Sequence, residues 1–252
     1  MGVTLCMMSR KGGCGKTSLS IHLAGLWAME GLKVRLVDLD SQASLSQFFL
    51  GSEAVENLRP SETVESVFGG AEPETVERET RFERITLIPA HLKLRVDRMA
   101  ELNLRSRKAD LTIVDTPPDL TNPMIRAALL TADFVVSPVD PEAFGAQSIV
   151  SVQQALHSVA IGFNPRLRLL GFVVNKRERL AVHGVVEDTL RRLHGDMIFG
   201  TTIPSLTAFK EAVLAGQPVT HYEESSKAAG IIKTLAAEVF ERIEKAADKR
   251  AA

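Results

Sequence analysis

A glycine-rich segment near the start of the chain constrains the fold more than any other part of the sequence. The letters SRKGGCGKTS occupy residues 9–18, between the apolar run VTLCMM and a stretch whose apolar residues recur at helical spacing. Closely spaced glycines let a backbone turn its N–H groups toward a bound anion without a side chain in the way. A helix that begins at the end of such a turn adds the positive end of its dipole. The segment therefore predicts a phosphate-binding loop between a buried strand and a helix.

The loop departs from the common phosphate-loop pattern, G-x-x-x-x-G-K-[ST], at its first glycine. Gly15, Lys16 and Thr17 match the end of the pattern. Arg10 stands where the first glycine is expected, and an additional lysine, Lys11, follows it directly. We expect Lys16 to bridge the β- and γ-phosphates of a nucleotide and the Thr17 hydroxyl to bind Mg²⁺. The predicted nucleotide contacts of the loop are Gly12, Gly13, Cys14, Gly15, Lys16, Thr17 and Ser18.

The rest of the chain alternates short apolar runs with helical patterns. We expect strands at residues 3–9, 34–40, 85–90, 111–117, 134–139, 167–175 and 197–204, and helices at 16–31, 143–159, 182–195 and about 225–247. Nearly continuous apolar strands are typical of a parallel sheet that is buried on both faces. The alternation predicts an α/β fold, with a doubly wound, mostly parallel sheet and helices on both faces. No linker interrupts it, so we expect residues 1–252 to form a single domain.

Three aspartates follow apolar runs that we expect to be strands. Asp38 and Asp40 lie in VDLDSQ, and Asp115 lies in TIVDTPP. Ligands of doubly wound sheets bind beyond the carboxyl ends of the strands, so we expect these carboxylates near the loop, on strands that flank the first. Mg²⁺ prefers hard oxygen ligands and keeps several waters. We expect Asp115 to hold the Mg²⁺ shell, Asp38 to support its waters, and Asp40 to orient the attacking water.

Charged segments and the final helix are less specific. Residues 51–84 are rich in glutamate and predict a solvated excursion with one short helix near residues 63–68, while residues 93–108 are rich in lysine and arginine. A charged helix face is the simplest interpretation of both segments. The final helix has a stripe of apolar residues on one face, which favours docking on the core over binding to a membrane surface. The residues of this stripe are Ile231, Leu235, Val239, Phe240 and Ile243.

Composition excludes some classes of function. The formal net charge is −1, so no overall field draws the molecule to nucleic acid or membrane. No apolar run approaches the length of a membrane-spanning helix. Cys6 and Cys14, in an expected strand and a tight loop, lack the spacing of a metal site and indicate a reducing, cytoplasmic compartment. Their positions also argue against an electron carrier with an iron–sulfur cluster.

The segment KGGCGKT resembles the loop K-G-G-x-G-K-[ST] of the ParA/MinD family of deviant Walker A ATPases, which are P-loop enzymes. The likeness continues through VRLVDLDSQASLS, IVDTPP, LLTADFVVSPVDPEAFGAQSI, GFVVNKRERL and IFGTTIPSLTAFKEAVLAGQPV. It covers nearly the whole chain and is strongest to the short ParA/Soj-type partition ATPases. The resemblance implies ATP or ADP and Mg²⁺ as cofactors.

The resemblance also implies roles for particular residues. Lys11 would reach across an ATP-bound homodimer to the phosphates of the other subunit, as a cation that acts in trans. Lys11, Lys16 and Asp40 would then form the catalytic set. Asn175 would contact adenine, and Pro204 would line the base pocket. Asp140 and Glu142 fall in the loop where the family continues its interface, without an assigned role.

The function that the resemblance implies is an ATPase switch that segregates or positions a cargo, with non-specific binding of double-stranded DNA and hydrolysis stimulated by a ParB-like partner or cargo adaptor. The cargo stays open between a plasmid, a chromosome region and a protein assembly. Such a protein is cytoplasmic and associates with the nucleoid without stable membrane insertion. Ser205 replaces an arginine frequent in the family, which weakens the expectation for DNA. The alternative is a MinD-like ATPase that cycles on a membrane. Candidate DNA contacts are Arg177, Arg179, Arg191, Arg192, Lys210, Lys227 and Lys233.

Overall fold

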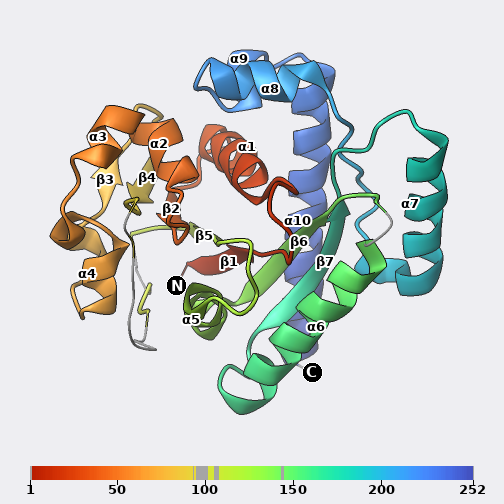
Figure 1. The fold of residues 1–252 in the computed structure, drawn as a ribbon, viewed down its shortest axis with the longest axis horizontal. Helices are drawn as coiled ribbons and strands as arrows, with labels where there is room; N and C mark the ends of the chain where they lie inside the picture. Colours follow the sequence, from red (N-terminus) through yellow and green to blue (C-terminus); the bar gives the residue numbers. More distant parts are fainter. Residues whose placement is uncertain (1, 93, 95–101, 105–107, 143–144, 252) are drawn as a thin grey trace.

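The chain folds around one sheet, and the computed structural model describes residues 2–92, 94, 102–104, 108–142 and 145–251. Within these residues the sheet has seven strands in the order β3-β4-β2-β5-β1-β6-β7 (Figure 1). Neighbouring strands are parallel except for β3 and β4. The strands are β1 (Val3–Met7), β2 (Val34–Asp38), β3 (Arg78–Glu79), β4 (Ile85–Ile88), β5 (Leu111–Asp115), β6 (Phe134–Val139) and β7 (Arg168–Val174). The predicted α/β fold with a mostly parallel sheet is confirmed.

Helices cover both faces of the sheet, and β1 shows how the sequence directs this, since alternate side chains of a strand point to opposite faces. Leu5 and Met7 enter a core with α1 (Lys16–Met29), α2 (Ser44–Leu50), α8 (Thr207–Leu214), α9 (Val219–Tyr222) and α10 (Lys227–Ala251). Cys6 and Met8 enter the opposite core with α3 (Ser52–Glu56), α4 (Val64–Phe68), α5 (Pro123–Thr131), α6 (Gly145–Gly162) and α7 (Ala181–His194). Figure 1 shows α1 and α10 on one side of the sheet and α5 and α6 on the other.

The predicted apolar stripe of the last helix does dock on the core. Leu235 and Val239 are fully buried, and Ile231 and Phe240 pack partly buried against the same cluster. Phe240 also meets the ring of the buried Trp27 from α1, with 5.2 Å between the ring centroids. Helix α10 is therefore part of the folded body. No described helix is long and apolar enough to cross a membrane.

Two expectations about strands are wrong. Strand β2 does not flank β1, because β5 lies between them. Residues 197–204 form no regular strand: a 3₁₀ turn, η3 (Gly195–Met197), precedes a chain that meets β7 and the residues after it through isolated bridges and single backbone hydrogen bonds. Side chains take the backbone groups that a ladder would use. The Glu238 carboxylate accepts from the N–H groups of Gly200 and Thr201, and Arg191 donates to the Phe199 carbonyl.

The acidic segment is less solvated than its composition suggests. Helix α4 matches the expected short helix, and the 3₁₀ turns η1 (Pro60–Glu62) and η2 (Pro73–Thr75) lie on either side of it. Two of its glutamates, Glu74 and Glu77, pair with Arg35 of β2 at 3.0 and 2.7 Å, and the Arg35 side chain is fully buried. Ion pairs with Arg35 therefore hold this acidic segment against the sheet. Most of the basic segment at 93–108 lies outside the described residues.

Candidate functional site

The glycine-rich loop joins β1 to α1, as predicted. Gly13 and Gly15 have φ angles of +76° and +97°, a region that residues with a Cβ rarely adopt. The Lys16 side chain is buried and donates to the Ser9 hydroxyl at 3.2 Å, so it folds back along its own loop. The Ser9 hydroxyl also lies 2.8 Å from the buried Cys14 thiol. The loop is a closed, internally bonded turn.

A carboxylate at the end of β5 meets the hydroxyl that follows the loop lysine. The Thr17 hydroxyl donates to Asp115 Oδ2 at 2.6 Å. The second oxygen, Asp115 Oδ1, is buried and has no hydrogen-bond partner among the described residues. Burial, with the charge of Asp38 as a second cause, raises the pKa of Asp115 to about 8. A buried carboxylate oxygen beside a threonine hydroxyl fits a Mg²⁺ shell, in which a cation stabilises the charged form.

Asp38 and Asp40 lie at the carboxyl end of β2. Asp38 pairs in register with Asp115 at the carboxyl end of β5. Asp38 is fully buried, and its Oδ2 already accepts bonds from the backbone N–H and the hydroxyl of Ser46 at 2.9 and 2.7 Å. Burial raises its pKa to about 6, against these hydrogen bonds. Asp40 is half-buried, and its Oδ1 accepts from the backbone of Gln42 at 3.0 Å. Asp38 therefore anchors the start of α2, whereas Asp40 keeps an accessible carboxylate.

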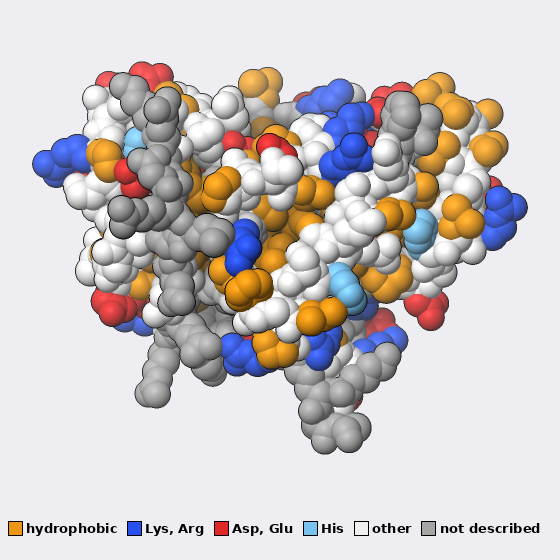
Figure 2. All heavy atoms as spheres, turned by 60° about the horizontal axis from the view of Figure 1, so that its bottom comes forward, with side chains coloured by type: hydrophobic (Ala, Val, Ile, Leu, Met, Phe, Trp, Pro, Cys, Tyr) orange, Lys and Arg blue, Asp and Glu red, His pale blue; other side chains and the backbone are white. Residues whose placement is uncertain are grey.

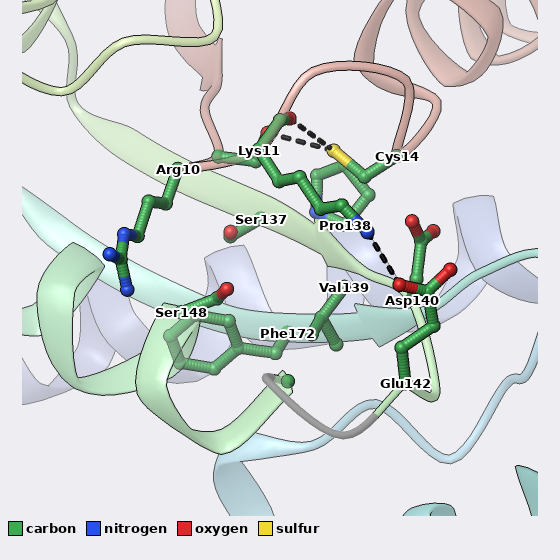
Figure 3. Close-up of a pocket in the computed structure, with 12 residues that line it drawn as sticks. Arg10, Lys11, Cys14, Ser137, Pro138, Val139, Asp140, Glu142, Ser148 and Phe172 are labelled. Carbon is green, nitrogen blue, oxygen red and sulfur yellow. Dashed lines mark hydrogen bonds and ion pairs between the residues drawn. The ribbon is translucent and has the colours of Figure 1, made fainter.

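Lys11 takes a different direction from Lys16. Its side chain is 57% exposed, and its Nζ lies 2.5 Å from Glu142 Oε2 in the segment after β6. This ion pair raises the pKa of Lys11 and lowers the pKa of Glu142. Figure 3 shows Lys11 reaching over a small cleft to Glu142, while Arg10 turns the other way. The two loop lysines thus have separate surroundings, one buried and one on the surface.

The end of β7 lies against the loop from a third side. Asn175 is buried, and its Nδ2 donates to the Cys14 carbonyl at 2.6 Å. A Cβ at Gly15 would lie 2.1 Å from the same nitrogen, so only glycine fits there. The next residue, Lys176, donates its ammonium to the Gly13 carbonyl. Pro204 is half-buried and forms a bridge with Arg177, beside this end of β7. Sequence reasoning gave Lys176 no role, although it lies in the stretch GFVVNKRERL, because its partner in the loop is 163 residues away in the sequence.

The candidate DNA contacts do not form one set. Arg177 and Arg191 both pair with Glu187, at 3.5 and 2.8 Å, and Arg191 also donates to Thr202. Lys233 pairs with Glu224. The remaining four candidates are exposed: Arg179, Arg192, Lys210 and Lys227. On the face in Figure 2, basic side chains are scattered around a central apolar hollow rather than gathered in one patch.

A glycine-rich loop between a buried strand and a helix, with a lysine folded into it and a threonine hydroxyl on a strand-end carboxylate, defines a P-loop nucleotide-binding protein. The model of the CobQ/CobB/MinD/ParA nucleotide-binding domain matches residues 5–219, and the chain belongs to this family. The chromosome-partitioning ATPase Soj of Thermus thermophilus is 32% identical over 252 residues, covering 96% of this chain and 97% of Soj. The chain is thus a ParA/MinD-type ATPase.

Solved structures share the fold. The ATP complex of Cyanothece McdA(D38A) superposes with a TM-score of 0.82 at 19% identity, covering 94% of this chain and 96% of that one. The septum site-determining protein MinD of Pyrococcus horikoshii, complexed with Mg-ADP, has a TM-score of 0.72 at 24% identity, covering 95% of this chain and 96% of MinD. At this level of identity the likeness establishes the architecture alone.

Proposed function

We propose that this protein is a switch that dimerises when it binds ATP, binds DNA without sequence preference and hydrolyses ATP to release it, so that a cargo is segregated or positioned. Its cofactors are ATP or ADP with Mg²⁺. The similarity to a chromosome-partitioning ATPase, over 96% of this chain, supports partition as the biological setting. A ParB-like protein or cargo adaptor is the proposed activator, and the nucleoid in the cytoplasm is the proposed location.

The separation of the two loop lysines carries this proposal. Lys16 is buried against its own loop, where it serves the phosphates of its own subunit. Lys11 is on the surface, and its ammonium donates to the exposed Glu142, an ion pair of a kind that contributes little free energy. A lysine that leaves such a pair at small cost is free to follow phosphates on a second subunit. ATP thereby favours a dimer in which each Lys11 acts in trans.

The remaining site residues have roles in this scheme. Thr17 and Asp115 would hold Mg²⁺, which supplies positive charge to the β- and γ-phosphate oxygens. Asp38 positions Asp40 by accepting the Asp40 N–H at 3.0 Å. Asp40 orients the attacking water from the edge of the sheet. Asn175 and Pro204 are the proposed adenine contacts, at the end of β7.

Duplex-DNA binding with ATP, with ADP and without nucleotide, each at several salt concentrations, tests the function. We expect binding with ATP only, equal for two unrelated sequences, and weakening linearly with log salt at a slope of about −0.9 per phosphate contact. DNA binding of equal strength with ATP, with ADP and without nucleotide, or no DNA binding with ATP, would remove DNA from the proposal. In that case ATP-dependent co-sedimentation with anionic vesicles would support the MinD-like alternative instead.

A further inference from the structure

Two consecutive residues at the end of β7 hold two consecutive carbonyl groups of the phosphate loop. Lys176 donates its ammonium to the Gly13 carbonyl, and Asn175 donates its amide to the Cys14 carbonyl at 2.6 Å. The bonded residues are 161 and 163 positions apart in the sequence, so these contacts depend on the fold and not on the motif. The glycine motif by itself leaves these carbonyls without a partner from its own segment.

The direction of these carbonyls sets the direction of the groups that bind phosphate. In a planar trans peptide, the C=O of one residue and the N–H of the next point to opposite sides. All described peptide bonds of the chain are trans. Holding the Gly13 carbonyl on the β7 side therefore turns the Cys14 N–H to the other side. Holding the Cys14 carbonyl does the same for the Gly15 N–H. A phosphate loop works by presenting such N–H groups together.

Lys176 adopts a backbone conformation that its side chain does not favour. Its φ angle is +55°, in the left-handed region where residues other than glycine, asparagine and aspartate are uncommon. The residues on either side are fixed by the backbone: Asn175 donates to the Val139 carbonyl and Arg177 to the Ile203 carbonyl. Strain of this kind persists where the surroundings over-determine it and is concentrated at functional sites. A glycine would fit this backbone more easily, so the lysine side chain is the feature to be explained.

We propose that Lys176 is a positioning residue for nucleotide binding, which orients the Gly13–Cys14 peptide so that its N–H faces the phosphates. Asn175 does the same for the following peptide. This inference rests on the proposed role of the loop in binding ATP. It adds a contribution of β7 to a site that the motif alone places between β1 and α1. A second possible use of the lysine is purely structural, as a counter-charge for the half-buried Asp140 nearby, and the two uses make different predictions.

Lys176→Gly separates binding from stability, because it removes the ammonium and also relieves the positive φ. Calorimetric titration of the full chain with ATP, ADP and adenosine, each with Mg²⁺, measures binding, and thermal unfolding without nucleotide measures stability. We expect the Kd for ATP and ADP to rise about tenfold, the Kd for adenosine to stay within twofold, and the Tm to stay equal or rise. Lys176→Arg should keep the ATP Kd within about threefold, since it preserves a charged donor.

Two further variants separate orientation from charge. Lys176→Met and Lys33→Met remove the same charge, and Lys33 is exposed on the turn before β2. Equal effects of both on ATP binding would show a general electrostatic effect and overturn the proposal. The proposal would also be overturned if Lys176→Gly left the ATP Kd unchanged, weakened adenosine binding as much as ATP binding, or lowered the Tm without nucleotide. If the wild-type chain itself fails to bind ATP, the proposed function fails instead, and the two failures are distinguishable.

Discussion

At the scale of single residues, the site contains buried acids whose environment favours the uncharged form. Asp115 is almost completely buried, beside a second fully buried carboxylate, Asp38, and one of its oxygens has no described partner. Burying a carboxylate in this way costs free energy unless a cation or a proton neutralises it. Without a cation, Asp115 therefore reduces the stability of the folded chain, as expected of the proposed Mg²⁺ ligand.

The pH dependence of stability tests this view of Asp115. Its pKa is raised to about 8 in the folded chain, from the ordinary 3.8. Between these values the folded state binds the proton that the unfolded state has lost, so the free energy of unfolding falls as pH rises, by at most about 1.4 kcal/mol per pH unit. Asp115→Asn removes this contribution. Urea unfolding at pH 6.5 and pH 8 without Mg²⁺ should show the variant gaining stability relative to wild type at the higher pH.

Comparing the variant with wild type also removes the effect of a competing group, His22. Burial lowers the pKa of His22 to about 4, which makes stability rise with pH between about 4 and 6.5. Above pH 6.5 that contribution levels off within about one pH unit, and it cancels in the comparison because His22 is present in both proteins. A difference between variant and wild type that stays constant from pH 6.5 to pH 8 would contradict the raised pKa of Asp115.

Asp40 provides a second test at the residue scale. Its carboxylate is half-buried at the turn after β2 and accepts a bond from Gln42, while Asp38 bonds its backbone. Asp40→Ala removes the proposed orienting group for water but none of the proposed phosphate contacts, so we expect ATP to bind with unchanged affinity and hydrolysis to fall by about 10²-fold or more. Phosphate release in single-turnover mixing measures the step. Hydrolysis at the wild-type rate would assign the water to another residue.

At the scale of elements, helix α7 combines two kinds of arginine. Arg191 pairs with Glu187 and donates to the Phe199 carbonyl and the Thr202 hydroxyl, so it fastens residues 198–204 to the helix. Arg192, the next residue, is exposed. Adjacent positions on a helix point about 100° apart, which is why one side chain faces the protein and the other faces solvent. Composition alone gives both the same expected role in DNA binding.

Alanine substitutions separate the two roles. Arg192→Ala should leave urea unfolding within about 0.5 kcal/mol of wild type and reduce the salt slope of ATP-dependent DNA binding by about 1. Arg191→Ala should lower the free energy of unfolding by about 1–3 kcal/mol, since it leaves the Phe199 carbonyl without the Arg191 donor and removes one of the cations paired with the half-buried Glu187. If Arg192→Ala leaves the slope unchanged, the DNA surface lies away from this face of α7.

These elements also show how much of the structure can be predicted from the sequence. The loop, its lysines and Asp115 could be placed because motif spacing and strand ends follow local rules. The order of strands could not, since β5 enters between β1 and β2 through contacts that are distant in sequence. Residues 197–204 read as a strand because they are apolar, but Glu238 and Arg191 take their backbone groups. Lys176 was invisible for the same reason, because its partner is 163 residues away.

At the scale of the whole molecule, the question is how a chain with a net charge of −1 changes state when it binds ATP. The long-range field is weak, so local charges decide association. The surface beside the loop carries Lys11 and Glu142, which are more than half exposed and paired with each other. In this pairing Lys11 is neutralised within its own subunit. In the proposed dimer, phosphates on a second subunit would compete with Glu142 for Lys11, and the outcome of that competition would set how much ATP the dimer needs.

Lys11→Ala and Glu142→Gln should therefore have opposite effects on dimerisation. Lys11→Ala should bind ATP within about threefold of wild type, since Lys16 is untouched, but remain monomeric and hydrolyse no ATP. Glu142→Gln should lower the ATP concentration for half-dimerisation by at most about fivefold, because an ion pair this exposed to solvent contributes little free energy. Light scattering across an ATP titration measures both, with ADP as the control. A Lys11→Ala variant that dimerises as readily as wild type would show that Lys11 does not act in trans. If Glu142→Gln leaves the ATP concentration for half-dimerisation unchanged, the ion pair does not compete with the partner's phosphates.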